Sequence, residues 1–324
     1  MMKFYFVKEG NFIRFQDKLF DLSNLDISFS KKEFLPGIYY IKYPYYTKIF
    51  LENYTDRITI YKNFENIYDN YNNELFFGRG LKKLLKNGEY KRTDFLVQTK
   101  ISDIFPYEFD AIKDKYSLFS SNYKSGISLE KACDSVFYQS LRNLHIEYAD
   151  IVLLHWPYPH SFIDIWHRME YYYKEGLVKA IGVCNFRESH LEELISKAEI
   201  KPMINQFEIH PLNAERNLVE YCQLNNIQVE GYCPLGLMNS KITSSKALMF
   251  LAEKHSKSIA QIILRWDIQR GIAPIPKSKS YIRISENCDI FDFELSDEDM
   301  ERIYLLDEKF KIYVESLFCP SYHR

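Results

Sequence analysis

The stretch SLRNLHIEYADIVLLHWP (140–157) contains the boundary between two kinds of secondary structure. The residues that lead into it, LEKACDSVFYQSLRNL (129–144), place apolar side chains at i, i+3, i+4 and i+7, which predicts an amphipathic helix. Residues 150–154 include a short apolar run that predicts a buried strand. A helix followed by a buried strand is the repeating unit of an α/β protein.

The same alternation extends in both directions along the chain. Further short apolar runs predict strands at 37–42, 57–61, 95–99, 180–183, 203–206, 227–231 and 272–275. Further segments with helical spacing lie at 161–176, 188–198 and 259–270. Strands that alternate with helices predict parallel pairing through right-handed crossovers. Eight such strands are the number that closes a (β/α)8 TIM barrel, whose site lies at the carboxyl ends of the strands.

The N-terminal region has a different pattern. The segment FYFVKEGNFIRF (4–15) predicts a β-hairpin that turns at residues 9–11 and closes the bottom of the barrel. Residues 16–36 match no element. We therefore expect a single α/β domain over residues 1–324, with the hairpin and an unassigned segment in 1–36, the barrel in 37–307 and a C-terminal tail in 308–324.

Composition excludes several classes of protein. Hydrophobic residues make up 46% of the 324 residues, which is enough apolar surface to exclude a wholly disordered chain. Lys+Arg 42 and Asp+Glu 44 give a formal net charge of −2, so no overall positive field favours nucleic acid as a partner. No apolar run approaches the ~18 residues of a membrane helix, so no membrane partner is expected.

Cysteine usage indicates the compartment. None of the 6 cysteines forms a C-x-x-C pair, which argues against a zinc site or a redox dithiol. Sparse, irregularly spaced cysteines indicate reduced thiols, and we expect a cytoplasmic protein without a bound metal. The sequence does not indicate the oligomeric state.

Polar side chains with chemical capability follow most of the predicted strands. Each stands at the end of a strand or in the loop after it, where a barrel collects its functional groups. These residues are Tyr71, Lys100, His155, Asn185, Gln206, Tyr232 and Lys277.

At these positions the chain resembles the aldo-keto reductases, from about residue 57 to residue 307. The resemblance rests on the stretches YNNE (71–74), FLVQTK (95–100), SLRNLHIEYADIVLLHWP (140–157), EGLVKAIGVCNF (175–186), INQFEIHP (204–211), GYCPLG (231–236) and IPKSKSYIRISEN (275–287). It implies an NADPH-dependent oxidoreductase that reduces the carbonyl of an aldehyde, a ketone or an open-form sugar. The reaction of this family requires no metal.

The resemblance also assigns the catalytic residues. Tyr71 matches the family's proton donor, and Lys100 matches the lysine whose ammonium lowers the pKa of that tyrosine. His155 matches the histidine that orients the carbonyl oxygen, and Trp156 matches an aromatic residue that lines the substrate pocket. The family places an aspartate five residues before the tyrosine, as a partner of the lysine, and this chain has Asn66 there.

The cofactor residues follow from the same resemblance. One group matches the positions around the nicotinamide, namely Cys184, Asn185, Gln206, Tyr232 and Leu235, with Cys184 where a serine is usual. A second group matches the residues that bind the 2′-phosphate of NADPH, namely Lys277, Ser278 and Arg283. The adenine contacts match Glu286 and Asn287.

Two departures from the family leave a second hypothesis open. Asn66 carries no charge to hold Lys100 as an ammonium, and the family's glycine-containing loop after the first strand is not recognisable near residues 37–46. The alternative is a catalytically weakened NADP(H)-binding protein with a regulatory or assembly role. The presence of Tyr71, Lys100 and His155 favours the reductase.

Overall fold

The computed structural model describes residues 74–101, 128–158, 161–278 and 280–313, apart from residues 87 and 89, and the backbone of several strands before residue 62. In this part of the chain no helix is both long and apolar enough to cross a membrane. The predicted residues Asn66 and Tyr71 lie outside the described residues.

A six-stranded sheet forms the centre of the larger part of the structure. Its strands lie in the order β12-β11-β10-β9-β8-β7 and each hydrogen-bonded pair is parallel. The strands are β7 (Gln98–Ile101), β8 (Ala149–Leu154), β9 (Val178–Cys184), β10 (Ile204–Glu208), β11 (Gln228–Tyr232) and β12 (Ile272–Ile275). Sequence order equals spatial order, as in one continuous arc of a (β/α)8 barrel.

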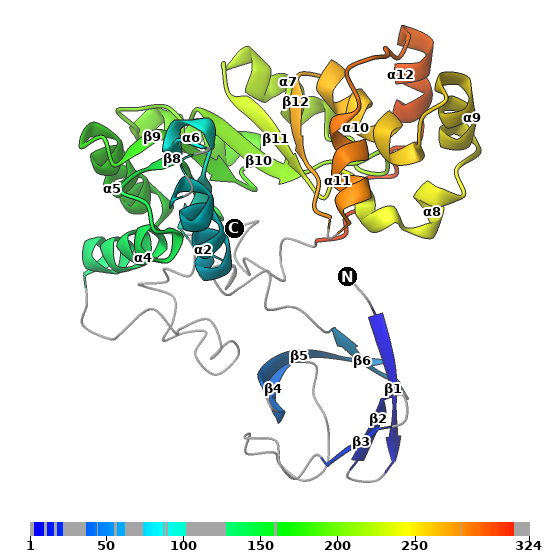
Figure 1. Ribbon diagram of the computed structural model, residues 1–324, viewed down its shortest axis with the longest axis horizontal. Coiled ribbons are helices and arrows are strands. Elements are labelled where there is room, and N and C mark those ends of the chain that lie inside the picture. Colours follow the sequence, from blue (N-terminus) through cyan, green and yellow to red (C-terminus); the bar gives the residue numbers. More distant parts are fainter. Residues whose placement is uncertain are drawn as a thin grey trace.

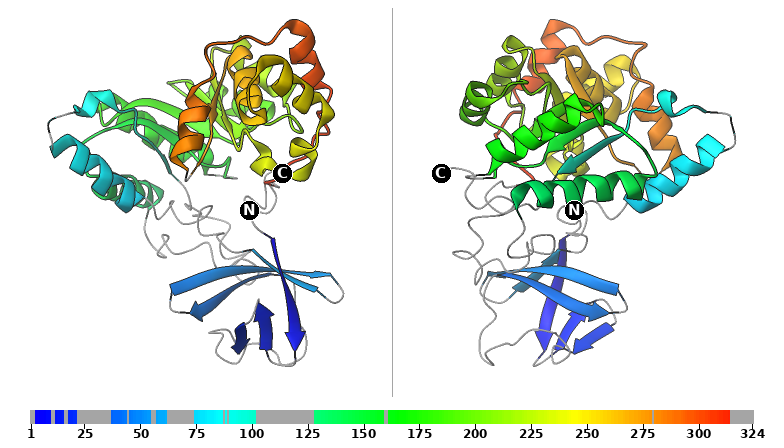
Figure 2. Two further views of the ribbon diagram at one scale, coloured as in Figure 1. Left: turned by 45° about the vertical axis from the view of Figure 1, so that its right-hand side comes forward. Right: turned by 90° about the vertical axis from the view of Figure 1, so that its left-hand side faces the viewer.

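Helices connect the strands and flank the sheet (Figures 1 and 2). Those that join consecutive strands are α4 (Leu129–Leu144), α5 (Phe162–Lys174), α6 (Glu188–Lys197), α7 (Arg216–Leu224), the short α8 (Ser240–Thr243), α9 (Lys246–His255) and α10 (Ile259–Gln269). Helix α2 (Glu74–Lys86) precedes the sheet, and α11 (Tyr281–Cys288) and α12 (Asp297–Tyr304) follow it. The predicted α/β class and its parallel strands 95–99 to 272–275 are confirmed, within a few residues at each end.

Serine side chains determine where several of these helices begin. Ser128, Ser245, Ser258, Ser280 and Ser296 each accept a hydrogen bond from a backbone N–H in the first turn of α4, α9, α10, α11 and α12. A serine at this position satisfies an N–H group that has no partner inside the helix. The local sequence therefore determines where these helices begin.

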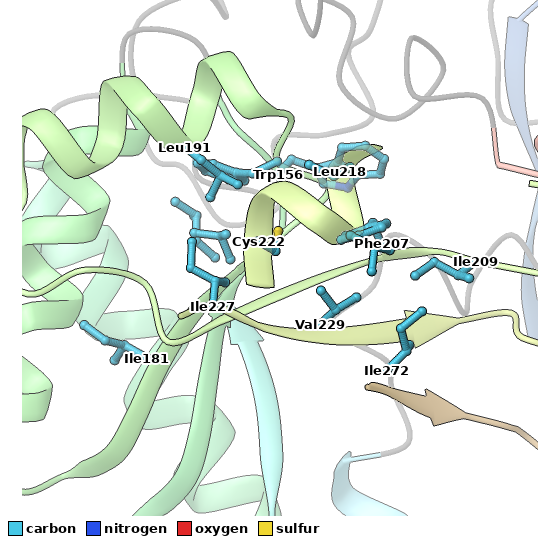
Figure 3. Packing of buried hydrophobic residues seen from close by; sticks show 14 of the residues in the cluster. Trp156, Ile181, Leu191, Phe207, Ile209, Leu218, Cys222, Ile227, Val229 and Ile272 are labelled. Atoms are coloured by element: carbon cyan, nitrogen blue, oxygen red, sulfur yellow. The ribbon is translucent and has the colours of Figure 1, made fainter. Parts of the chain in front are cut away.

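One face of the sheet packs against the helices and forms the main hydrophobic core. Figure 3 shows Leu218 and Cys222 of α7 beside Phe207 of β10 and Val229 of β11. All four side chains are buried. Side chains alternate between the two faces of a strand, so the residues next to Phe207 and Val229 lie on the other face.

We call that other face the inner face. Its apolar part is a separate cluster of Ile151, Leu153, Cys184 and Ile204. The inner face also shows that the sheet is curved. Gln98 of the edge strand β7 donates a hydrogen bond from its Nε2 to Glu230 of β11, at 2.9 Å, although three strands separate β7 from β11 in the sheet. A flat sheet would hold these side chains far apart, since neighbouring strands are about 4.8 Å apart.

The first two predicted barrel strands pair differently from the prediction. Residues 37–42 and 57–61 are strands, β4 (Gly37–Tyr43) and β6 (Arg57–Tyr61), but they belong to an antiparallel sheet with the order β3-β2-β1-β6-β5-β4. The reason is β5 (Tyr45–Tyr54), which fills the space between them and pairs antiparallel with both. A parallel connection needs a crossover of about a dozen residues or more, usually a helix, and the intervening segment is itself extended.

The predicted N-terminal hairpin is present in that same sheet. Strand β1 (Lys3–Glu9) pairs antiparallel with β2 (Phe12–Phe15), and Glu9 lies opposite Phe12. Strand β3 (Lys18–Asp21), which the sequence did not predict, continues the meander. Closure of the barrel bottom by the hairpin stays a prediction.

Two glycines of α2 provide a matched test of helix packing. A Cβ atom added to Gly78 would lie 2.2 Å from the carbonyl oxygen of Asn143, at the end of α4, whereas a Cβ on Gly80 would meet no atom within 4 Å. We expect Gly78→Ala to lower the free energy of unfolding by about 1–3 kcal/mol, the usual cost of overpacking. Gly80→Ala should raise it by up to about 1 kcal/mol, since alanine is the better helix former. Urea denaturation of both variants measures the difference, and equal effects would contradict the close contact of α2 with α4.

Candidate active site

The site residues that the sequence predicts in the sheet come from one face of consecutive strands. Residues at every second position of a strand share a face. Lys100 is two residues from Gln98 on β7, and Tyr232 is two residues from Glu230 on β11. Cys184 belongs to the inner cluster with Leu153. The alternation of the strands thus brings the carboxyl-terminal residues to the same end of the inner face.

His155 directly follows β8 and extends its pairing with β7. Its backbone N–H donates to the carbonyl oxygen of Ile101 at 3.0 Å, and only 8% of the residue is exposed. Burial, with the positive charge of Lys100 as the second cause, lowers the pKa of His155 to about 3. The imidazole is therefore neutral near pH 7 and can donate one hydrogen bond without a charge.

The neutral state of His155 has a consequence for stability. Because its pKa in the folded chain, about 3, is below the ordinary histidine value of 6.5, the unfolded chain takes up the proton first as the pH falls. This contribution to stability is present above pH 6.5 and declines below it, by up to about 2 kcal/mol at pH 5. Urea unfolding at several pH values should show this extra decline in the parent chain but not in His155→Gln. Equal pH slopes would mean that folded His155 accepts a proton above pH 5.

Asn185 links three of the strand ends. The residue has a positive φ of 63°, a conformation that asparagine adopts more readily than most residues. Its Nδ2 donates to the carbonyl oxygen of His155 at 3.2 Å, and its Oδ1 accepts from the hydroxyl of Tyr232 at 2.9 Å. The backbone N–H of Asn185 donates to the carbonyl oxygen of Gln206 at 2.8 Å. The left-handed turn thus directs a carboxamide across the carboxyl end of the sheet.

Cys184 and Gln206 extend the hydrogen-bonded network from Asn185. The Nδ2 of Asn185 lies 3.3 Å from the Sγ of Cys184, and that Sγ lies 3.8 Å from the Oε1 of Gln206. Burial raises the pKa of Cys184 to about 12, so this residue is a neutral thiol and a weak donor. Gln206 is 3% exposed and its Nε2 donates to Glu230 at 2.7 Å.

Trp156 and Leu235 are the two apolar residues among the predicted site residues. Trp156 is buried, and its ring centroid lies 5.9 Å from that of His155. Leu235 is half-buried and packs against the main core, just before the 3-10 helix Gly236–Met238. Trp156 thus places apolar surface beside His155, whereas Leu235 contributes to the packing of the main core.

The predicted phosphate and adenine residues form a separate group after β12. Lys277 lies in the loop before α11, and Arg283 is in the first turn of α11, where its backbone N–H donates to the capping hydroxyl of Ser280. Ser278 stabilises the same turn, since its Oγ accepts from the backbone N–H of Ser280 at 3.1 Å. The side chains of Lys277, Arg283 and Glu286 are exposed and that of Asn287 is half-buried. Two exposed cations beside a helix N-terminus suit a dianion.

Three residues that contact the predicted site residues or each other were not predicted from the sequence: Gln98, Glu230 and Tyr313. Glu230 accepts hydrogen bonds from Gln98 and Gln206. Tyr313 packs its ring against Tyr232, with centroids 5.7 Å apart. The alternation of β11 could have placed Glu230 on the same face as Tyr232, but contacts between distant segments have no local signal.

A buried carboxylate, that of Glu208, holds the segment that carries Tyr313. Glu208, at the end of β10, accepts hydrogen bonds from the backbone N–H groups of Ile312 and Tyr313 at 2.6 and 2.8 Å. The Nε2 of His210 lies 2.9 Å from the same carboxylate. These hydrogen bonds hold residues 312–313 in place beside the aromatic ring of Tyr232.

Comparison with known proteins assigns the family. The model of the aldo/keto reductase family matches residues 63–308, and the chain belongs to this family. A glyoxal reductase of Bacillus subtilis is 48% identical over 174 residues, which are 54% of this chain and 62% of that protein. The methylglyoxal reductase DkgA of Escherichia coli K12 is 34% identical over 231 residues, 71% of this chain and 75% of that protein. The chain thus spans less than two thirds of the length of the first of these relatives.

A solved structure agrees with this assignment. An aldo-keto reductase of Bombyx mori, crystallised in complex with NADP, superposes with a TM-score of 0.66 at 29% identity, over 76% of this chain and 79% of that one. The predicted family is therefore confirmed. The predicted roles of individual residues stay predictions.

Proposed function

We propose that the chain reduces the carbonyl group of a small aldehyde or ketone with NADPH as the hydride donor. One observation carries the proposal: the ends of β8, β9, β10 and β11 are joined through His155, Asn185, Gln206 and Tyr232 into one hydrogen-bonded network. The relatives named as glyoxal and methylglyoxal reductases support small dicarbonyl compounds as the substrate class.

The residues present fit a nicotinamide cofactor. A carboxamide needs both a donor and an acceptor, and Asn185 and Gln206 offer both types of group beside each other. The ring of Tyr232 provides a flat apolar surface at the same place. The exposed cations Lys277 and Arg283 lie in the segment after β12, where they would hold the 2′-phosphate. Bound NADPH would supply the hydride.

The side chains of the site orient the carbonyl group, supply the proton and exclude water. Neutral His155 donates a hydrogen bond to the carbonyl oxygen and orients it. Tyr71 gives its proton to the same oxygen as negative charge develops there. The ammonium of Lys100 lowers the pKa of the tyrosine and makes proton transfer easier near neutral pH. The buried ring of Trp156, next to His155, excludes water from one side of the substrate.

The test measures the loss of NADPH absorbance when the purified protein is mixed with each of several carbonyl compounds. Glyoxal, methylglyoxal and an aromatic aldehyde cover small dicarbonyls and a larger substrate. We expect turnover with the dicarbonyls. NADPH binding without oxidation by any of them would contradict the proposal and favour the second candidate, a binding protein with weakened catalysis.

Asn66 is the observation that favours the second candidate, and one substitution addresses it. In Asn66→Asp a carboxylate would hold Lys100 as an ammonium and favour ionisation of Tyr71. We expect faster reduction and a limb of the pH–rate profile moved toward lower pH, since one unit of pKa corresponds to ~1.4 kcal/mol. Rates measured from pH 5 to 9 for both proteins provide the comparison. Activity that appears only in the variant would support a binding protein that lost catalysis at this position.

A further inference from the structure

Glu230 lies on the inner face of the sheet, where it connects β11 with β10 and β7. One carboxylate oxygen, Oε2, accepts hydrogen bonds from the Nε2 of Gln206 at 2.7 Å and from the Nε2 of Gln98 at 2.9 Å. The two glutamines belong to β10 and β7, which lie on either side of β8 and β9 in the sheet. Glu230 is thus a single acceptor for two amides that approach it from different strands.

An ionised carboxylate determines which end of an amide faces it. The two ends of a glutamine amide have nearly the same shape, but the NH₂ group donates and the oxygen accepts. A carboxylate only accepts, so the NH₂ group of Gln206 must face Glu230 and its Oε1 must point away. Within the residues that the structure describes, the donor nearest to this Oε1 in a hydrogen bond is the weakly donating thiol of Cys184, at 3.8 Å.

We propose that Glu230 is a positioning residue that fixes the amide orientation of Gln206 and, through it, the orientation of the nicotinamide. The inference rests on the proposed function. With Oε1 directed away from Glu230, Gln206 presents an acceptor to the NH₂ group of the nicotinamide carboxamide. If the amide could rotate, it would present a donor to a donor in half of its orientations. A mismatched pair of this kind lowers affinity by about tenfold or more.

The charge of Glu230 is what makes this control strong. A hydrogen bond to an ionised group is about twice as strong as one between neutral groups. Glutamine at position 230 could accept through its own oxygen, but it could equally turn its NH₂ group toward Gln206. Glu230→Gln therefore keeps the size of the side chain and removes the constraint on orientation.

A double-mutant comparison tests the inference. The four proteins are the parent, Glu230→Gln, Gln206→Ala and the double variant. The affinity for NADPH is measured by fluorescence titration, and kcat and KM with methylglyoxal are measured at saturating NADPH. We expect Glu230→Gln to weaken NADPH binding about tenfold and to change kcat much less. In the Gln206→Ala background the second substitution should have no further effect, because the residue it acts through is gone.

The face of hydride transfer provides a readout that a merely structural role would not change. NADPH deuterated at either C4 position shows which hydrogen moves to the product. The parent should transfer one of the two, and Glu230→Gln should transfer a measurable share of the other, as the carboxamide loses its fixed partner. Glu220→Gln is the matched control, since Glu220 is exposed on α7. It should match the parent in affinity and in stereochemistry.

The possible results separate the role of Glu230 from the proposed function. An unchanged NADPH affinity in Glu230→Gln, or equal effects with and without Gln206, would overturn the inference and leave the proposed function intact. A parent chain that binds no NADPH would overturn both. If Glu230→Gln does not fold, Glu230→Asp keeps the charge but withdraws it from Gln206, and the same four-protein comparison then decides the question.

Discussion

Tyr71→Phe is expected to lower carbonyl reduction by on the order of 10²–10⁴-fold, the usual contribution of a general acid. The phenol hydroxyl acts only while negative charge develops on the carbonyl oxygen, so its loss should lower kcat and leave the affinity for NADPH within about twofold. Steady-state rates with methylglyoxal and a fluorescence titration with NADPH measure the two quantities.

The control for this variant is Tyr221→Phe, which removes the same hydroxyl from a half-buried tyrosine on α7. It should reduce aldehydes at the parent rate. If Tyr71→Phe also reduces them at the parent rate, another group supplies the proton and the resemblance at residues 71–74 does not extend to the chemistry. If Tyr71→Phe loses NADPH binding as well, Tyr71 has a structural role in the cofactor site.

The second large effect concerns the choice between NADPH and NADH. The chain should bind NADPH at least about tenfold more tightly, because each charge-assisted contact with the 2′-phosphate contributes ~1.5–3 kcal/mol. Arg283→Ala should remove most of this preference by weakening NADPH binding, while NADH binding changes little. Fluorescence titration with both cofactors, repeated at higher salt, gives the ratio and its electrostatic part.

Arg302→Ala is a matched control, since Arg302 is on α12 and pairs with Glu298 in the same helix. It should leave the NADPH-to-NADH ratio unchanged. Equal affinities of the parent for the two cofactors would remove the phosphate assignment of Lys277 and Arg283. A preference that survives Arg283→Ala would instead assign the phosphate mainly to Lys277 and Ser278.

The sequence predicted the parallel part of the fold because its strands are short apolar runs that alternate with segments of helical spacing. Residues 150–154 and 272–275, for example, are short apolar runs between segments of helical spacing, and they form β8 and β12. The same reasoning assigned residues 37–42 and 57–61 to the barrel. There it was wrong about pairing, because a local apolar run has the same appearance in parallel and antiparallel sheets. The decisive feature, the extended segment Tyr45–Tyr54, was not predicted.

The candidate site shows the same division between local and long-range information. Residues at strand ends, such as His155 and Asn185, could be found because the fold class itself predicts where functional groups collect. The contact of Gln98 with Glu230 joins residues that are 132 positions apart, and it depends on the curvature of the sheet. The attachment of Tyr313 to Glu208 likewise depends on the path of the C-terminal segment. No periodicity in the sequence encodes either distance.

The distribution of thiols gives the chain a natural attachment point for a reporter dye. Maleimide and related reagents react with the thiolate, and burial raises the pKa of Cys133, Cys184, Cys222 and Cys233. Within the part of the chain that the structure describes, Cys288 is the exposed cysteine, and it is the last residue of α11. A fluorophore on Cys288 would follow Asn287, at the proposed adenine end of the cofactor site. It would report cofactor arrival optically while the nicotinamide end stays chemically untouched.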